Sequence, residues 1–392
     1  MFARRGDAPV LVELLEKDAV SMETLRGRYG SLLALVRTLI GVVPSCDRYL
    51  EIWPTAFRSY NVMVPNLLNL PLLVWGMAAP RATVGLALYV SSRSAGCPYC
   101  SAHTCSFALR RGATVDQVAA ALGAGDRLSP ADRAAVRVAR ALSVVPADLR
   151  DDDRAELARH FSEADVEWLI LAVGMMGWLN KTMDALGVPL EEPTAAEVVS
   201  VIGPTGWTPG VHMTGAPRAG ARPPADSIAT RLSVLRHAPS AIRLDKRWTA
   251  GVPDRWPAVG EFLRRTTGHD FPVLSRLKHG RAVRAIATMI RDNLGESVVG
   301  REAKLAAGLT YATAVGDAPL IAELRALGAQ TGSDGPMQRL AEAIAPSPAR
   351  VDTAVVEACR AIPPAGIVEA VTFVALLQLL HRVSVFYPSA PV

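Results

Sequence analysis

The chain has 392 residues, of which half are apolar and 20% are charged, and this is the composition of a globular protein. Its formal net charge of +5 is spread without a Lys- or Arg-rich run, so we expect no nucleic acid partner. Residues 1–7 lack the apolar core of a signal peptide. The apolar segments 62–79, 166–179 and 367–380 are interrupted by proline or too short to span a bilayer. We therefore expect a cytoplasmic protein with no membrane partner.

Helices are predicted along the whole chain, because Ala and Leu dominate the periodic segments and alternating β-branched residues are scarce. One helix is expected over 98–111, with Cys97 as its N-cap, proline at its first position and Gly112 after its end. Another is expected to begin after Ser129 and to run to about Leu142. The sequence therefore predicts an all-α fold.

A stretch rich in glycine and proline divides the chain. Between Gly203 and Pro224 there are five glycines and five prolines, and no hydrophobic period survives. We interpret residues 203–226 as an interdomain linker. The chain then consists of a first helical domain over 1–202 and a second helical domain over 227–392.

The two predicted domains carry the same landmarks in the same order. Each has a Trp-Pro pair, then an arginine sixteen residues before the start of a helix, then a glutamate thirteen residues before an asparagine or arginine. The landmarks are Trp53, Arg81 before Cys97 and Glu167 before Asn180 in the first domain, and Trp256, Arg301 before Asp317 and Glu369 before Arg382 in the second. This order predicts an internal duplication, in which the second copy has no pair of cysteines.

The strongest chemical signal is the segment CPYCSAH at 97–103. Its two thiols, Cys97 and Cys100, are one helical turn apart, which is close enough for a reversible disulfide. His103 follows one turn after Cys100 on the same face, where it can take the thiol proton. Attack on a peroxide would give a sulfenic acid, which the second cysteine condenses to a disulfide. The segment therefore predicts thiol redox chemistry.

The surroundings of this segment favour a thiolate. Between residues 52 and 115 there are five arginines and no acidic residue, and both cysteines are expected in the first turn of a helix. Nearby cations and a helix N-terminus lower the pKa of a thiol. From the residues alone, Cys97 is the favoured nucleophile, because it is the more N-terminal of the two and is expected to be the more exposed.

Other interpretations of these residues stay open. The two cysteines could be small buried core residues, and His103 a structural histidine. A zinc site of these three residues with Cys105 uses suitable ligands, but four ligands within nine residues of one helix cannot all converge tetrahedrally. Structural roles are expected for several further candidates. These are Cys46, Cys105 and Cys359 in the core, Glu167 and Glu369 as caps or ion pairs, and His381 with Arg382 as helix-terminal cations.

Residues from about 80 to 190 resemble the alkylhydroperoxidase AhpD / carboxymuconolactone decarboxylase family. The resemblance rests on three segments in the family's order: 95–104 around the two cysteines, 128–133, and 161–187. It implies an AhpD-like helical bundle, duplicated within the chain. It also implies a homo-oligomer, and a structural second half that provides the interface a family member makes with another chain.

The resemblance further implies roles for the site residues. Cys100 would be the peroxidatic thiol, Cys97 the resolving thiol and His103 the relay base. No cofactor, metal or flavin, is implied, so electrons would come from an external dithiol donor, a lipoyl or thioredoxin-like protein. The predicted function is that of a thiol-dependent peroxidase or disulfide oxidoreductase with a peroxide substrate. The alternatives are a redox-responsive interaction protein without efficient turnover, and a lactone decarboxylase-like enzyme.

The chain departs from the family's pattern at two positions. The family's relay glutamate, about twelve residues before the first cysteine, corresponds to Gly85, and its histidine, four residues after the second cysteine, corresponds to Thr104. A carboxylate that orients His103 must therefore come from elsewhere. The sequence offers Glu51, Asp116 or a residue of the second half as candidates.

Overall fold

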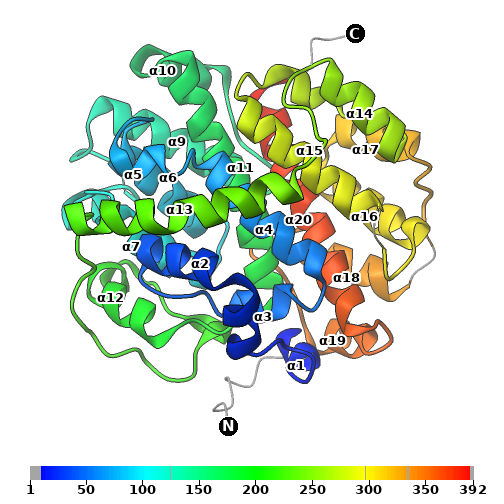
Figure 1. The fold of residues 1–392 in the computed structure, drawn as a ribbon, viewed down its shortest axis with the longest axis horizontal. Helices are drawn as coiled ribbons and strands as arrows, with labels where there is room; N and C mark the ends of the chain where they lie inside the picture. Colours follow the sequence, from blue (N-terminus) through cyan, green and yellow to red (C-terminus); the bar gives the residue numbers. More distant parts are fainter. Residues whose placement is uncertain (1–9, 124, 296, 333–334, 389–392) are drawn as a thin grey trace.

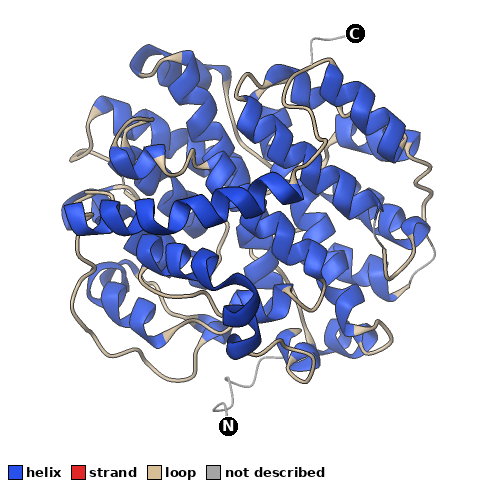
Figure 2. Ribbon diagram, in the orientation of Figure 1, coloured by secondary structure: helices blue, strands red, loops and turns tan. Residues whose placement is uncertain are grey.

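The computed structural model describes residues 10–123, 125–295, 297–332 and 335–388. Within these ranges every regular element is a helix (Figure 2). The all-α fold expected from the sequence is confirmed. Residues 1–7, in which no signal peptide is expected, lie outside the described part of the chain.

The helices fall into two groups along the chain. The first group is α1 Val12–Leu15, α2 Met22–Ile40, α3 Cys46–Leu50, α4 Pro54–Leu67, α5 Leu72–Trp75, α6 Arg81–Ser94, α7 Pro98–Arg110, α8 Val115–Ala120, α9 Pro130–Ser143, α10 Asp151–His160, α11 Glu163–Leu186 and α12 Glu192–Ile202, followed by the short 3-10 helices η1 Gly203–Thr205 and η2 Gly210–His212. The second group is α13 Ile228–Trp248, α14 Ala258–Thr267, the 3-10 helix η3 Pro272–Arg276, α15 Gly280–Gly295, α16 Arg301–Val315, α17 Ala318–Ala326, α18 Pro336–Ile344, α19 Thr353–Cys359 and α20 Pro364–Phe386.

Two long helices, α11 and α20, pack against each other in the middle of the molecule (Figure 1). Most helices of the first group lie on one side of this pair, and α14 to α19 lie on the other. Helix α4 packs on α15 across the same boundary. The landmark glutamates Glu167 and Glu369 lie on α11 and α20, so two helices that the predicted duplication relates to each other are in direct contact.

Small residues let α20 approach α11 closely. A Cβ atom added at Gly177 would lie 3.0 Å from Arg382 Cδ, and one added at Gly174 would meet a side chain of α20 at 3.2 Å. Larger residues at these two positions would hold the helices further apart. Because the helices are close, Arg382 Nη1 donates to Val173 O on α11 and to Ser91 Oγ on α6, both at 2.9 Å.

Equivalent arginines make the same contact in both halves. Arg81 at the start of α6 donates from Nη1 to Val74 O at 3.1 Å. Arg301 at the start of α16 donates from Nη1 to Leu294 O at 3.0 Å. In each case the carbonyl belongs to the residue seven positions earlier. The shared contact supports the duplication.

The helices that follow these arginines are capped alike. Cys97 is the N-cap of α7, and its Sγ accepts the backbone N–H of Cys100 at 3.3 Å. Asp317 is the N-cap of α17, and its Oδ1 accepts the backbone N–H of Leu320 at 2.9 Å. Two helices were predicted individually in the first half, and these are α7 and α9, which begins after Ser129. Both end within one residue of the position expected from the sequence.

The segment 203–226 connects the two halves and also packs onto the first. Two residues of this segment, Trp207 and His212, are buried, and Trp207 Nε1 donates to Pro98 O at 3.1 Å. Asp226 forms an ion pair of 2.6 Å with Arg111. Helix α13, which follows this segment, packs against α2 of the first half. The division into domains at this segment stays a prediction.

One helix of the described residues, α20, is long and apolar enough to cross a membrane. It has 23 residues, and the mean hydropathy of its most apolar window is 1.5. The expectation that segment 367–380 is too short was wrong, because the helix extends from Pro364 to Phe386. However, 89% of the apolar window is buried inside the protein, as in the core helix of a globular fold.

We expect Gly85→Ala to destabilise the fold. A Cβ atom at Gly85 on α6 would lie 2.6 Å from Ala108 Cα on α7, so the two helix backbones would have to move apart. The expected loss in free energy of unfolding is about 1–3 kcal/mol, measured by urea denaturation. Gly27→Ala on α2 is the matched control, since an added Cβ there has no atom within 4 Å. Equal stability of the two variants would show that α6 and α7 separate easily.

Candidate active site

The two cysteines of the CPYCSAH segment lie at the first turn of α7, which packs against α6 and α11. Cys97 has the extended backbone of an N-cap residue, and Pro98 occupies the first helical position, where no N–H is needed. Cys97 is fully buried and Cys100 is 4% exposed. The expectation that Cys97 is the more exposed thiol was therefore wrong. All five cysteines are free thiols in this structure.

Burial dominates the ionisation of both thiols. It raises the pKa of Cys97, an effect that the hydrogen bond from Cys100 opposes, and it raises the pKa of Cys100 well above the ordinary value. The arginines that are near in sequence do not offset this. Arg110 and Arg111, for example, form ion pairs with carboxylates of α12 and of segment 203–226. The thiolate-favouring surroundings expected from the sequence were therefore wrong, and Cys100 needs a base.

A cavity of about 180 Å³ lies beside Cys100. Cys100 and His103 both line it, whereas the wall does not include Cys97. Aliphatic side chains and methionines from α2, α4, α11 and α13 form much of the wall. Those of α11 are Met175, Met176, Leu179 and Met183, and those of α13 include Val234, Ala238, Ala241 and Ile242. Of the two thiols, only Cys100 can meet a molecule held in this cavity.

The polar side chains at one part of the cavity wall pair with one another. Arg281 of α15 donates from Nε to Asn66 Oδ1 at 3.2 Å and from Nη1 to Asn69 Oδ1 at 3.1 Å. Asn66 Nδ2 donates to Asp245 Oδ1 at 2.8 Å. Because these groups already have partners, the cavity offers a ligand mainly apolar surface. Such a cavity suits a small apolar molecule.

His103 is held by a buried carboxylate. Its Nε2 lies 2.7 Å from Glu191 Oε2, and Tyr99 OH donates to Glu191 Oε1 at 3.0 Å. The backbone N–H of Ser45 also donates to this carboxylate. Burial acts to raise the pKa of Glu191, but the charge of His103 and its hydrogen bond outweigh it, and the pKa is lowered overall. The imidazole is therefore fixed in one orientation next to the cavity.

Glu191 is the carboxylate that orients His103, and it is not one of the candidates expected from the sequence. Glu51 forms an ion pair of 3.0 Å with Arg28, and Asp116 is exposed on α8. A glutamate cannot stand at Gly85, because even a Cβ there would meet the backbone of α7. No local pattern in the sequence marks Glu191, because it is 88 residues away from His103.

The second half contributes a buried cation, Arg382, which contacts α6 and α11. Burial lowers the pKa of Arg382 to about 10, and the charges of Tyr311 and Cys100 act in the opposite direction. His381, its neighbour on α20, lies with Nδ1 2.7 Å from Asp317 Oδ2. The expectation that these two residues are helix-terminal cations and nothing more was wrong, because both are buried in the helix interface.

The two landmark glutamates have structural roles, as expected. Glu167 accepts the backbone N–H groups of Lys278 and His279, which precede α15, at 2.8–3.0 Å. Glu369 accepts the N–H groups of residues 298 and 299, which precede α16, and forms an ion pair of 2.5 Å with Lys304. Each carboxylate thus anchors the start of a helix in the second half.

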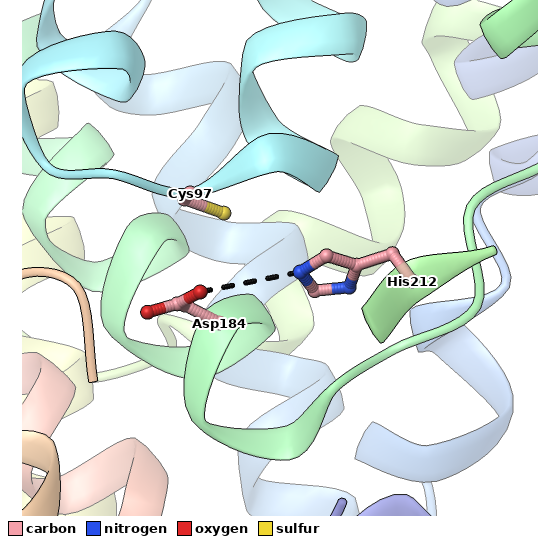
Figure 3. A group of neighbouring side chains, drawn as sticks. All are labelled: Cys97, Asp184 and His212. Carbon is pink, nitrogen blue, oxygen red and sulfur yellow. Dashed lines mark ion pairs between the residues drawn. The ribbon is translucent and has the colours of Figure 1, made fainter. Parts of the chain in front are cut away.

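Cys97 has a different set of neighbours from Cys100 (Figure 3). Its Sγ, a carboxylate oxygen of Asp184 and a ring nitrogen of His212 all lie within 4.8 Å of one another. Asp184 Oδ1 is 4.0 Å from His212 Nε2. Burial raises the pKa of Asp184 to about 6, an effect that its hydrogen bond from Ala349 N opposes. A thiol, a carboxylate and an imidazole could together hold a metal ion.

The zinc site considered from the sequence does not assemble. Of its four residues, only Cys97 belongs to the group in Figure 3, and His103 is turned to Glu191 instead. Cys105 is buried, as expected for a core residue. Cys46 is buried too, but it lines the same cavity as Cys100, which the sequence did not indicate.

No protein-family model matches the chain, and no curated protein sequence matches it. Two solved structures are similar to part of it: the debrominase Bmp8 in its apo form, and a cysteine-to-alanine variant of Bmp8 in complex with 2,3,4-tribromopyrrole. The first is 22% identical with a TM-score of 0.40, and the match covers 45% of this chain and 94% of Bmp8. The second is 21% identical with a TM-score of 0.40, and covers 47% and 96%.

Glu191→Gln is expected to destabilise the protein in a pH-dependent way. The folded-state pKa of Glu191 is lowered, so its charged form contributes stability above the unfolded pKa, and this is lost as the pH falls through the folded value. The variant should therefore lose thermal stability at about pH 7 and lose less below about pH 4. Thermal unfolding, followed by circular dichroism, measures the melting temperature at both pH values.

The matched control for this prediction is Glu192→Gln, because Glu192 is the exposed neighbour of Glu191. We expect it to leave the melting temperature unchanged at both pH values. An equal loss for Glu191→Gln at neutral and acid pH would contradict a role for the Glu191 charge.

Proposed function

We propose that this chain is a thiol-dependent peroxidase that reduces small apolar hydroperoxides through Cys100 and Cys97. The observation that carries the proposal is the position of Cys100. It lies on the wall of an apolar cavity that His103 also lines, its backbone N–H donates to Cys97 Sγ at 3.3 Å, and Glu191 holds the His103 ring. These are the parts that a two-cysteine peroxidase needs: a substrate space, a nucleophile, a resolving thiol and a base.

The cavity supports a small substrate with little polarity. Its volume of about 180 Å³ is close to that of apolar protein cavities of about 150 Å³ that bind benzene. The methionines of α11 can adapt to different shapes, since their side chains are flexible and polarisable. Hydrogen peroxide would fit, but the apolar wall favours an organic hydroperoxide, whose carbon chain gains from leaving water.

His103, in its neutral form, would take the proton of Cys100. Burial keeps Cys100 in the thiol form at neutral pH, so the thiolate must be formed at the moment of attack. The negative charge of Glu191 stabilises the imidazolium that results. The thiolate attacks the outer peroxide oxygen, the O–O bond breaks, and the alkoxide leaves as an alcohol with the proton from His103.

Cys97 would complete the cycle. Its sulfur attacks the sulfenic acid on Cys100, forms the disulfide and releases water. Overall, one hydroperoxide and two thiols give one alcohol, one water and one disulfide. The disulfide must then be reduced by an external dithiol donor, for which a lipoyl or thioredoxin-like protein is our proposal. Cys97 makes its attack from within the protein, as its complete burial requires.

Rapid quench with mass spectrometry tests the proposal. The reduced protein is mixed with a slight excess of cumene hydroperoxide, and the state of each cysteine is followed. We expect a Cys97–Cys100 disulfide to form much faster than a free thiol is oxidised. Cys100→Ser should abolish the reaction, whereas Cys359→Ser, which removes a buried thiol of α19, should leave it unchanged. Oxidation of Cys100 no faster than that of glutathione would refute the peroxidase.

A second candidate function is a redox-responsive interaction protein without useful turnover. It is favoured by the contact between Gly96 and Pro348, where a Cβ atom on the glycine would lie 2.8 Å from the proline ring. A disulfide at Cys97 would shift the adjacent Gly96, and the loop of the second half that contains Pro348 would then have to move. Slow oxidation with a changed protease-cleavage pattern near residue 348 would favour this function. A lactone decarboxylase-like activity, the third candidate, would survive Cys100→Ser.

A further inference from the structure

We propose that Cys97, Asp184 and His212 form a binding site for Zn²⁺. The three residues come from three separate elements: the N-cap of α7, the last turns of α11, and η2 in segment 203–226. Their donor atoms lie within 4.8 Å of one another, and their side chains face a common centre in Figure 3. His212 and Cys97 are completely shielded from solvent, and the Asp184 side chain is 13% exposed.

Hydrogen bonds outside the group orient the ligand atoms inward. His212 Nδ1 lies 2.7 Å from Val188 O, and because a carbonyl only accepts, Nδ1 carries the hydrogen. In the neutral imidazole this turns the Nε2 lone pair toward Asp184 and Cys97. Asp184 Oδ2 accepts the N–H of Ala349 at 2.6 Å, so Oδ1 points to the same centre. Metal-binding imidazoles and carboxylates are commonly fixed in this way.

The donor set matches zinc in chemistry and in charge. Zinc takes sulfur, nitrogen and oxygen ligands, and a tetrahedral ion would set them about 3.3–3.6 Å apart. The separation of 4.0 Å between Asp184 Oδ1 and His212 Nε2 needs only a small side-chain rotation to reach this range. One thiolate, one carboxylate and a neutral imidazole balance the charge of a divalent cation, so the buried complex is neutral.

Zinc binding would compete with the disulfide, and this consequence rests on the proposed function. A thiolate bound to the ion cannot attack the sulfenic acid on Cys100. Conversely, disulfide formation excludes the ion: once Zn²⁺ has dissociated, the Cys97 thiolate, the Cys100 thiol, one hydroperoxide and one proton give the disulfide, an alcohol and water, and no thiolate remains to rebind Zn²⁺. The site would thereby make peroxide reduction sensitive to free zinc.

Cobalt titration of the full, reduced, metal-free protein tests the site. Co²⁺ replaces Zn²⁺ and gives a near-ultraviolet band whose intensity counts the thiolate ligands. We expect one ion per chain, one thiolate and the visible bands of a tetrahedral ion, with displacement by Zn²⁺. Cys97→Ser should abolish the band, and His212→Gln and Asp184→Asn should each weaken binding by at least about tenfold.

The controls are Cys100→Ser and the surface variant His160→Gln, both of which should bind Co²⁺ as the wild type does. Circular dichroism shows whether each variant folds. If His212→Gln does not fold, Asp184→Asn provides the test of the ligand set. Two thiolates, with the band lost in Cys100→Ser, would overturn the proposal, because the ion would sit on the cysteine pair alone. Unchanged Co²⁺ binding in His212→Gln would also overturn it.

The two proposals fail separately. Cobalt binding as described without fast peroxide reduction would leave the metal site and remove the peroxidase. Fast disulfide formation without cobalt binding would leave the peroxidase and remove the metal site. Slower disulfide formation in His212→Gln, with no Co²⁺ bound by the wild type, would instead make His212 a base for Cys97 and overturn the zinc site.

Discussion

The close packing of α11 against α20 is the constraint on which the rest of this structure depends. Gly174 and Gly177 remove the side chains that would separate the two helices, and Arg382 crosses the contact to bind α11 and α6. Helix α11 also supplies four wall residues of the cavity and the carboxylate of Asp184. The position of α11 therefore sets the cavity, the surroundings of Cys100 and those of Cys97 together.

Burial is the dominant effect at the cysteine pair. It raises the pKa of both thiols, and the local excess of arginines does not reverse this; Arg110 and Arg111, for example, are paired with the carboxylates of Glu197 and Asp226. A buried thiol reacts only where a base and a compensating charge are brought to it. In the proposed mechanism, the His103–Glu191 pair would provide the base.

The two thiols share one helical turn but have different surroundings. Cys100 lines an apolar cavity that is also lined by a histidine held by a carboxylate, whereas Cys97 lies beside Asp184 and His212 and is not part of the cavity wall. The segment between the two halves contributes to this difference. It brings His212 into the interior and places Trp207 against Pro98, so it completes the site as well as connecting the halves.

Local patterns in the sequence were sufficient for the helical class, for α7 with Cys97 as its cap, and for the closeness of Cys97, Cys100 and His103, because all of these depend on residues within one or two turns. The structural roles of Glu167 and Glu369 could also be predicted. The tertiary structure alone decided that Glu191 orients His103, that Arg382 is buried against α6 and α11, and that Asp184 and His212 meet Cys97. These contacts join residues from different helices, and no spacing along the chain encodes them. The tertiary structure also decided the ionisation of the thiols, since desolvation depends on the atoms packed around a group and not on its neighbours in sequence.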